Sequence, residues 1–245
     1  MAENFKTDTI KTERKNCKMI AHRGLSGIER ENTCAAFVLA GSRSYYGIET
    51  DVHVTADGKF IICHDDNLVR VSGTDMIIEE SAYSDIKNVK ITDSDGKTYR
   101  SDLVFPDLID YVNICKKYNK RAVLELKNRI ANEKIDEIVK IIKDSGQFYN
   151  TTFISFDAEN LKYLRSTEKN ADIQFLTGEV TGETVEFLKK YGFGLDAYFE
   201  SVNKNVVDEL HAANLNVNCW TVDDKTVAER LISYGVDFIT TNILE

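Results

Sequence analysis

Residues 122–143 read AVLELKNRIANEKIDEIVKIIK, and this stretch contains one complete repeating unit of the expected fold. Residues 122–126 form a short and mostly apolar run, which is typical of a buried β-strand. Isoleucines then recur at the spacing of one helix face, at Ile135, Ile138, Ile141 and Ile142. A buried strand followed by an amphipathic helix is the unit from which parallel α/β sheets are built.

The same alternation runs through most of the 245-residue chain. Eight principal strands are expected, at residues 19–22, 47–54, 122–126, 152–156, 173–177, 193–199, 217–222 and 238–241. Helices are expected between them, at residues 33–45, 106–118, 133–143, 159–166, 183–191, 206–214 and 225–234. Eight alternating units in roughly 250 residues are typical of a closed (β/α)8 barrel, the TIM barrel of the α/β class, so residues 1–245 are expected to form one catalytic domain. An open doubly wound sheet is the alternative, but it normally carries a G-x-G-x-x-G turn after its first strand, which this chain lacks.

The alternation is interrupted between the second and third principal strands. Asp57 and Gly58 favour a tight turn that leads into a hairpin-like continuation at residues 60–64. Residues 66–104 are then rich in serine, threonine and aspartate and hold only short apolar clusters. Long irregular segments inside compact domains are usually functional loops or insertions, so we expect a small insertion here, after the second strand.

Net charge and hydropathy indicate which kinds of molecule the protein binds. The formal net charge is −9, and a negative surface repels both nucleic acid and anionic lipid. No apolar run approaches the roughly 20 residues that a membrane-spanning helix needs, and residues 1–17 lack the apolar centre of a signal peptide. We therefore expect a cytoplasmic protein that acts on a small molecule, with no nucleic-acid partner and no stable membrane association.

Three carboxylates fall at strand ends that a barrel would bring together. Glu49 and Asp51 lie two residues apart on the second strand, so their side chains share a face, and Glu125 lies near the end of the third. Such groups repel one another unless a cation lies between them. Their oxygens are the ligands that Mg²⁺ or Ca²⁺ prefers, whereas a zinc site more often uses histidine or cysteine. The pattern predicts one divalent cation, Mg²⁺ or Ca²⁺, and a rim or structural role for His53, one step further along the same face.

Two histidines and two cationic side chains end the same strands. His22 and Arg23 follow the first strand, and His64 ends the hairpin extension of the second. Lys127 shares a strand face with Glu125. Imidazole titrates near neutral pH, so both histidines are candidates for proton transfer. Each residue alone is more often structural than catalytic, and their coincidence at predicted strand ends is what indicates a functional site.

Several motifs resemble those of the glycerophosphodiester phosphodiesterase family in order and spacing. They are Ala21-His22-Arg23-Gly24, Glu31-Asn32-Thr33, Gly47-Ile48-Glu49-Thr50-Asp51-Val52, Thr55-Ala56-Asp57-Gly58, Cys63-His64-Asp65, Leu124-Glu125-Leu126-Lys127, Ser155-Phe156-Asp157, Trp220-Thr221-Val222 and Gly235-Val236-Asp237. The resemblance runs from about residue 18 to the C-terminus, and its early block is the most specific part. It implies a barrel with a small insertion after the second strand.

The resemblance also implies roles for the ionisable residues at the strand ends. It implies a divalent cation held by Glu49, Asp51 and Glu125. It further implies that His22 and His64 are the general acid and base, in an order that the sequence leaves open.

The remaining roles concern the substrate. The resemblance implies that Arg23 and Lys127 lie near the phosphate. Trp220, at the end of a predicted strand, either packs against the glycerol carbons or fills the barrel mouth, and the resemblance favours the first role. Two residues depart from the family's usual pattern. Arg30 stands where proline is usual, which concerns loop geometry, and Asn242 stands where aspartate is frequent, which leaves Asn242 without an assigned role.

The expected reaction is metal-dependent hydrolysis of glycerophosphodiesters to glycerol 3-phosphate and an alcohol. The resemblance implies that a glycerol hydroxyl attacks first and that water then opens a cyclic phosphate. A phospholipase-type phosphodiesterase acting on lysolipids is an alternative, although residues 66–104 offer little apolar surface beyond Met76, Ile77 and Ile78. A catalytically inert barrel acting as a binding module is another alternative. It predicts the loss of at least one metal-binding or proton-transfer residue, and all are present.

Overall fold

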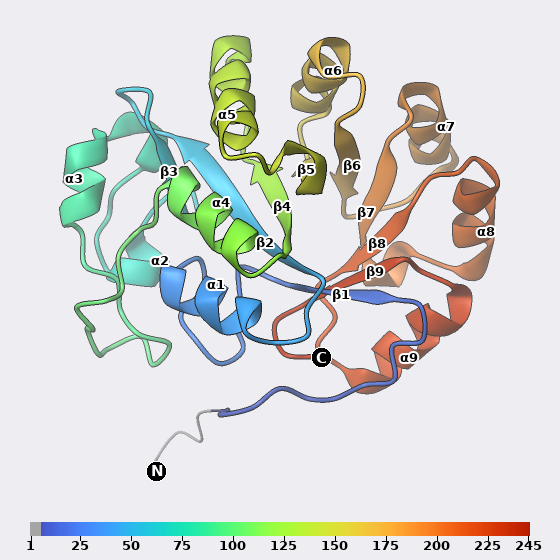
Figure 1. Cartoon of the computed structure of the whole chain (residues 1–245), viewed down its shortest axis with the longest axis horizontal. Coiled ribbons are helices and arrows are strands. Elements are labelled where there is room, and N and C mark those ends of the chain that lie inside the picture. The colour runs from blue at the N-terminus through green and yellow to red at the C-terminus, as the bar shows by residue number, and fades with distance from the viewer. Residues whose placement is uncertain (1–5) are drawn as a thin grey trace.

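Eight parallel strands close into a barrel in the computed structural model, which describes residues 6–245 (Figure 1). They are β1 (Lys18–Ala21), β2 (Gly47–Val54), β4 (Arg121–Leu126), β5 (Thr151–Ser155), β6 (Asp172–Thr177), β7 (Gly194–Tyr198), β8 (Val217–Trp220) and β9 (Phe238–Thr241). The pairing of β1 with both β2 and β9 closes the ring. A further strand, β3 (Phe60–Ile62), pairs antiparallel with β2 and forms the expected hairpin. The (β/α)8 barrel predicted from the sequence is confirmed.

Helices connect the strands and surround the barrel, as the series from α5 to α9 in Figure 1 shows. The main helices are α1 (Cys34–Gly41), α4 (Leu108–Lys117), α5 (Asn132–Asp144), α6 (Ala158–Thr167), α7 (Gly182–Tyr191), α8 (Lys204–Ala212) and α9 (Lys225–Tyr234). Within residues 6–245, no helix is long and apolar enough to cross a membrane. Residues 1–5, part of the stretch in which no signal peptide is expected, lie outside the described residues.

Most helix ends differ by one or two residues from those predicted, and α8 spans residues 204–212 rather than 206–214. Two of the differences have an identifiable contact beside them. Helix α4 begins at Leu108 rather than Pro106, because the Asp110 carboxylate accepts the Asp107 backbone N–H at 3.3 Å and closes the first turn there. Helix α1 ends at Gly41 rather than near residue 45. The chain must leave the helix early because the Tyr46 N–H already donates to the backbone oxygen of Met19, at 2.8 Å.

Side chains alternate along each strand, so that one set packs against the surrounding helices and the other set points inside the barrel. In β4, Ala122, Leu124 and Leu126 belong to the large core shared with the surrounding helices. Val123 instead belongs to a small apolar cluster inside the barrel. The other buried members of that cluster are Ile20, Ile154, Leu176 and Phe238. Because Glu125 follows Val123 by two residues, its side chain also faces inward, toward the carboxyl end of the barrel.

The segment of residues 66–104 has its own small core although it is mainly irregular. It contains the short helices α2 (Val69–Ser72) and α3 (Tyr83–Asn88) and a 3₁₀ turn, η1 (Ile78–Glu80), and lies beside β3 in Figure 1. Its short apolar runs and the residues that flank it form a separate core, composed of Ile61, Cys63, Leu68, Val71, Ile78, Ile86, Ile91, Leu103 and Phe105. Most of the segment lies outside these short helical pieces, as expected of an irregular insertion, but its scattered apolar residues converge in space.

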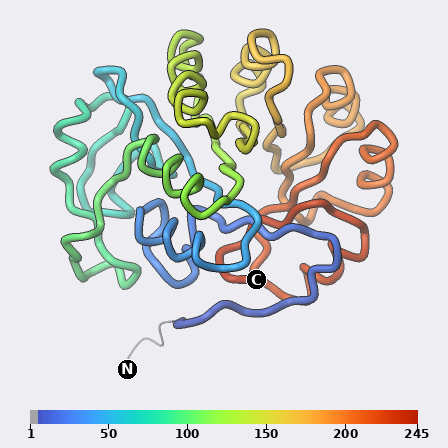
Figure 2. The backbone as a smooth tube through the Cα atoms, in the orientation of Figure 1, coloured from blue at the N-terminus to red at the C-terminus, as the bar shows by residue number. Residues whose placement is uncertain are grey.

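The two ends of the described chain run side by side (Figure 2). Ile10 donates its N–H to the Ile243 oxygen at 3.0 Å and accepts the Glu245 N–H at 2.8 Å. The Glu245 carboxylate accepts from Lys11 Nζ and from the Ser44 N–H, both at 2.7 Å. These contacts fix the residues that directly follow β9 and therefore one part of the barrel mouth.

Gly24, in the loop after β1, is expected not to tolerate alanine. A Cβ there would lie 2.7 Å from both the carbonyl carbon and the Cβ of Ala36, at a φ of +78°. Gly73 has a similar φ of +75° but nothing within 4 Å of the same position. The left-handed backbone costs about 1–2 kcal/mol for alanine at either site, and overpacking adds roughly 1–3 kcal/mol at Gly24 alone. Urea unfolding should give a larger loss of stability for Gly24→Ala than for Gly73→Ala, and equal losses would contradict the argument.

Candidate active site

Three carboxylates converge at the carboxyl ends of β2 and β4. Glu49, Asp51 and Glu125 each offer one oxygen, and these oxygens lie within 4.8 Å of one another. Asp51 and Glu125 are direct partners in the sheet register, and all three side chains are buried. Oxygens this close can share one ion, so this carboxylate cluster could hold a divalent cation.

Burial sets the charge state of the carboxylate cluster. Burial and the nearby charge of Asp51 raise the pKa of Glu49 well above its usual range and that of Glu125 to about 8. Asp51 is equally buried, but the charges of Lys127 and Arg23 outweigh burial and lower its pKa. Since two of the three acids resist ionisation beside the third, a bound cation would stabilise the cluster by offsetting their repulsion.

Two cationic side chains flank the carboxylate cluster. Lys127 Nζ lies 3.0 Å from Glu125 Oε1 and 3.8 Å from Asp51 Oδ1. Arg23 Nε lies 4.0 Å from Asp51 Oδ2 and is buried without a hydrogen-bond partner among the described residues. A buried, unpaired guanidinium donor beside a possible cation site is suited to an anionic ligand such as a phosphate.

His22 follows β1 and is held by an amide. Its Nδ1 lies 2.7 Å from Asn242 Oδ1, and its Nε2 lies 4.0 Å from Glu49 Oε2. Asn242 Nδ2 donates to Asp223 Oδ2 at 2.6 Å, so the amide oxygen is the atom that faces His22. The ring therefore carries its proton on Nδ1 and directs the Nε2 lone pair toward the carboxylates. Burial and the charge of Arg23 lower the pKa of His22 to about 4, so the neutral ring prevails at neutral pH.

His64 is held by a carboxylate instead. Its Nδ1 lies 2.7 Å from Asp65 Oδ1, and Arg70 Nε donates to Asp65 Oδ2 at 2.6 Å. The Arg70 guanidinium also binds both oxygens of Glu31, at 2.7 and 2.8 Å. Glu31 Oε1 in turn accepts from Arg23 Nη1 at 3.0 Å. A chain of alternating charges therefore links His64, through Arg70 of the insertion, to Arg23.

His53 is fully buried and does not line the pocket that contains the other two histidines. Its Nδ1 lies 3.3 Å from Glu79 Oε1, and its Nε2 lies 3.5 Å from the backbone oxygen of His64. These contacts support the loop that carries His64 and connect it to the insertion. They agree with the rim or structural role expected from the sequence.

A pocket of about 210 Å³ opens at the carboxyl end of the barrel. One side is formed by ionisable groups, namely His22, Arg23, Glu49, His64 and Glu125. The opposite side is apolar and is formed by Ile154, Phe156, Leu176 and Trp220. The Trp220 indole N–H donates to the Asp196 backbone oxygen at 3.1 Å, and the ring meets Phe156 edge to face with centroids 5.7 Å apart. A pocket with one charged and one apolar side suits a small phosphate ester that also has a carbon chain.

Phe156 and Asp196 are among the lining residues to which no role was assigned from the sequence. Phe156 lies in the motif Ser155-Phe156-Asp157 and ends a predicted strand, but nothing in the pattern assigned its ring to the pocket. Asp196 interrupts the apolar run of residues 193–199, and a polar residue at an inward strand position was the signal available. Of the predicted residues, Asp51 and Lys127 lie behind the lining rather than in it, beside Glu125.

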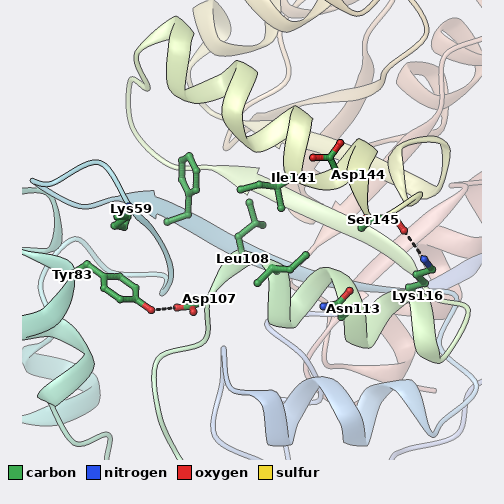
Figure 3. Close-up of a pocket in the computed structure, with 11 residues that line it drawn as sticks. Lys59, Tyr83, Asp107, Leu108, Asn113, Lys116, Ile141, Asp144 and Ser145 are labelled. Carbon is green, nitrogen blue, oxygen red and sulfur yellow. Dashed lines mark hydrogen bonds between the residues drawn. The ribbon is translucent and has the colours of Figure 1, made fainter.

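A larger hollow of about 670 Å³ lies on the outer side of the barrel, against α4 and α5 (Figure 3). Some of its polar groups are paired with one another or with the backbone. Tyr83 Oη donates to Asp107 Oδ1, and Lys116 Nζ donates to the Ser145 backbone oxygen, both at 2.7 Å. Its lining includes no histidine and no member of the carboxylate cluster. The groups suited to catalysis therefore lie at the barrel mouth, although the outer hollow is larger.

Residues 22–245 match the sequence profile of the Glycerophosphoryl diester phosphodiesterase family. The chain belongs to this family. It is therefore a phosphoric diester hydrolase, as the resemblance of its motifs implied. A glycerophosphodiester phosphodiesterase from Bacillus altitudinis is 27% identical, over 92% of this chain and 94% of its own length.

Solved structures of glycerophosphodiester phosphodiesterases share the same barrel. A phosphodiesterase of Oleispira antarctica, solved in complex with the product sn-glycerol-3-phosphate, is 25% identical and has a TM-score of 0.83, with 92% of both chains covered. A glycerophosphodiester phosphodiesterase of Parabacteroides distasonis is 28% identical and has a TM-score of 0.78, with 94% of both chains covered. The likeness therefore extends over nearly the whole chain in both comparisons.

Mg²⁺ or Ca²⁺ should stabilise the protein through the carboxylate cluster. A ligand that binds only the folded state adds about 2.7 kcal/mol to the unfolding free energy at roughly 100 times its dissociation constant. Scanning calorimetry should show a cation-dependent rise in the Tm of the wild type. Glu125→Gln should lose most of this rise, whereas Glu133→Gln, at an exposed position on α5, should keep it. A wild type that responds to neither cation, or a Glu125→Gln variant with the full response, would exclude this cation site.

Proposed function

We propose that the chain hydrolyses glycerophosphodiesters to glycerol 3-phosphate and an alcohol, with one divalent cation and two-histidine acid–base catalysis. One observation carries the proposal: a carboxylate cluster suited to a cation adjoins two histidines with different partners in a single pocket. The relative from Oleispira antarctica, solved with sn-glycerol-3-phosphate as product, supports the substrate class.

Glu49, Asp51 and Glu125 would hold the cation. Mg²⁺ or Ca²⁺ suits them because all three donors are oxygens. The raised pKa of both Glu49 and Glu125 supports the proposal, because a cation would stabilise the anionic form that each resists alone. When bound, the cation would offset the negative charge that builds on the phosphoryl oxygens.

Arg23 and Lys127 would supply the remaining positive charge around the phosphate. Arg23 lines the pocket with an unpaired Nε donor, which a phosphate oxygen would satisfy. Burial opposes the charge of Lys127, but Glu125 and Asp51 raise its pKa, so Lys127 stays protonated. Fixed cations of this kind stabilise charge in the transition state without rearranging during the reaction.

The two histidines differ in their partners, and their roles are assigned from that difference. His22 is fixed by a neutral amide with its Nε2 unprotonated, which suits a general base. Burial lowers the pKa of His64, but the Asp65 carboxylate opposes this by stabilising the protonated ring, which suits His64 better than His22 to the role of general acid. His22 would take the proton of the attacking hydroxyl as its oxygen bonds to phosphorus. His64 would give a proton to the alcohol oxygen as its bond to phosphorus breaks.

The attacking group would be the substrate's own hydroxyl next to the phosphate, and the first product would be a cyclic phosphate. Water would then open the ring with the histidine roles reversed. His64, now neutral, would take a proton from water, and His22 would return its proton to the glycerol oxygen. Both histidines would recover their starting states, so water is the one co-reactant required.

Within the described residues, no feature favours the two alternative functions. A lysolipid would need room for an acyl chain, and the apolar side of the 210 Å³ pocket has four side chains. An inert barrel would lack a metal-binding or proton-transfer residue, and each is present. The net charge of −9 supports a small-molecule partner over nucleic acid or an anionic membrane surface.

The purified protein should release choline and glycerol 3-phosphate in equal amounts from glycerophosphocholine. EDTA should abolish turnover, and excess Mg²⁺ or Ca²⁺ should restore it, because the carboxylate cluster would have no other counter-charge of the same strength. Coupled enzymatic assays for the two products measure this directly. The proposal would be wrong if glycerophosphocholine, glycerophosphoethanolamine and glycerophosphoglycerol all resist hydrolysis in both cations.

His22→Ala and His64→Ala should each lower kcat by at least ~10²-fold, because general acid–base groups typically contribute about 10²–10⁴. His211→Ala, at an exposed position on α8, is the matched control and should retain activity. Circular dichroism would check that each variant folds. Wild-type kcat in both site variants would rule out the two-histidine mechanism.

A p-nitrophenyl leaving group separates the two roles, since p-nitrophenolate departs without a proton. Replacing the alcohol by p-nitrophenol should rescue His64→Ala more than His22→Ala. The opposite pattern would exchange the acid and base assignments while leaving the two-histidine mechanism intact.

A further inference from the structure

Asp196 is a buried carboxyl group in the pocket that the proposed mechanism does not use. It lies on β7, which stands four strands from β2 in either direction around the ring of eight. Asp196 lines the pocket, is 2% exposed, and has an Oδ1 atom without a hydrogen-bond partner among the described residues. A buried polar atom without a partner is unfavourable, so its presence in a pocket points to a ligand.

The neighbours of Asp196 leave its carboxyl group available. The sheet register places it between Leu176 of β6 and Asn218 of β8. Leu176 is apolar, and Asn218 exchanges hydrogen bonds with Thr240 at 3.0 and 3.3 Å. Burial, opposed by the Asn218 amide, raises the pKa of Asp196 to about 8. At neutral pH the carboxyl group therefore offers one O–H donor and one carbonyl acceptor.

A neutral carboxyl group in an enclosed position suits an uncharged hydroxyl group better than a cation. The ionisable side of the pocket suits the phosphate, and Asp196 stands across the pocket from it. Between them, Trp220 presents an apolar ring that is held in place by its N–H bond to the Asp196 backbone. A glycerol chain has the same order of groups, with C–H bonds between the phosphate ester and a terminal hydroxyl.

We propose that Asp196 is a substrate-binding residue that holds the hydroxyl group of the glycerol moiety most remote from the phosphate. The alcohol differs between substrates and must leave through the open mouth, so the buried end of the pocket receives the part that all glycerophosphodiesters share. The hydroxyl next to the phosphate remains available for attack. This proposal rests on the proposed function and adds a basis for selecting glycerol over simpler diols.

Two substrates test the proposal directly. One is glycerophosphocholine, and the other is its analogue made from propane-1,2-diol, which keeps the hydroxyl next to the phosphate and lacks the terminal one. A site that binds a hydroxyl discriminates strongly against an analogue without it, so the wild type should favour glycerophosphocholine by at least ~10² in kcat/KM. Calorimetric binding of sn-glycerol 3-phosphate and of the corresponding propanediol phosphate gives a second readout that requires no turnover.

Asp196→Leu keeps a similar volume without hydrogen-bonding capacity. It should lower kcat/KM for glycerophosphocholine by at least ~10²-fold and change that for the propanediol analogue by less than about 10-fold. Asp196→Asn keeps a donor and an acceptor and should retain most of the discrimination. Gln174→Leu is the matched control, since Gln174 is also buried on the inner face with an unpaired oxygen but does not line the pocket. It should leave the discrimination unchanged.

Each outcome decides between the proposals. Equal losses on both substrates in Asp196→Leu would overturn the role of Asp196 and leave the proposed function intact. A loss confined to choline and ethanolamine substrates, with glycerophosphoglycerol unaffected, would also overturn it, because Asp196 would then bind a cationic alcohol. A wild type without turnover would count against the proposed function, and equal binding of the two phosphates would then overturn the Asp196 proposal as well. If Asp196→Leu fails to fold by circular dichroism, Asp196→Ala replaces it in the same comparisons.

Discussion

Glu49, Asp51 and Glu125 bring three carboxylate oxygens within 4.8 Å of one another in an interior from which water is largely excluded. Repulsion in such a setting is strong because the surroundings screen it poorly. The neighbouring groups are arranged around this repulsion, with Arg23 and Lys127 against Asp51.

Local rules of strand geometry were sufficient to predict that centre. Side chains two residues apart share a strand face, which places Glu49 beside Asp51, and parallel strands in a barrel bring Glu125 to the same end. The hairpin after β2 followed in the same way from the turn at Asp57 and Gly58. The start of α4 was missed by two residues because it depends on a capping contact at Asp107, which no apolar spacing reveals.

Long-range contacts were beyond such rules. His22 and Asn242 are separated by 220 positions and meet where the closing ring brings β1 beside β9. Asp196 is recognisable in sequence as a polar residue in an apolar run, but its exposure to a pocket depends on side chains from several other strands. The separate core of residues 66–104 likewise joins apolar residues from Ile61 to Phe105 that show no common period. In each case the contact forms because the fold brings distant residues together, and no local sequence pattern predicts it.

Arg70 belongs to the insertion, yet the paired charges it joins reach His64 through Asp65 and reach Arg23 through Glu31. A barrel enzyme can usually exchange a loop without disturbing residues on the strands, because loops and scaffold contribute separately. Here the exchangeable segment supplies the counter-charge for two groups at the strand ends. Suppose that residues 66–104 were replaced in evolution so that the pocket admits a different alcohol. The same replacement would change the charged surroundings of His64, which is proposed to protonate that alcohol, and of Arg23, which is proposed to bind the phosphate. Substrate range and catalytic reactivity would then change together in evolution rather than independently.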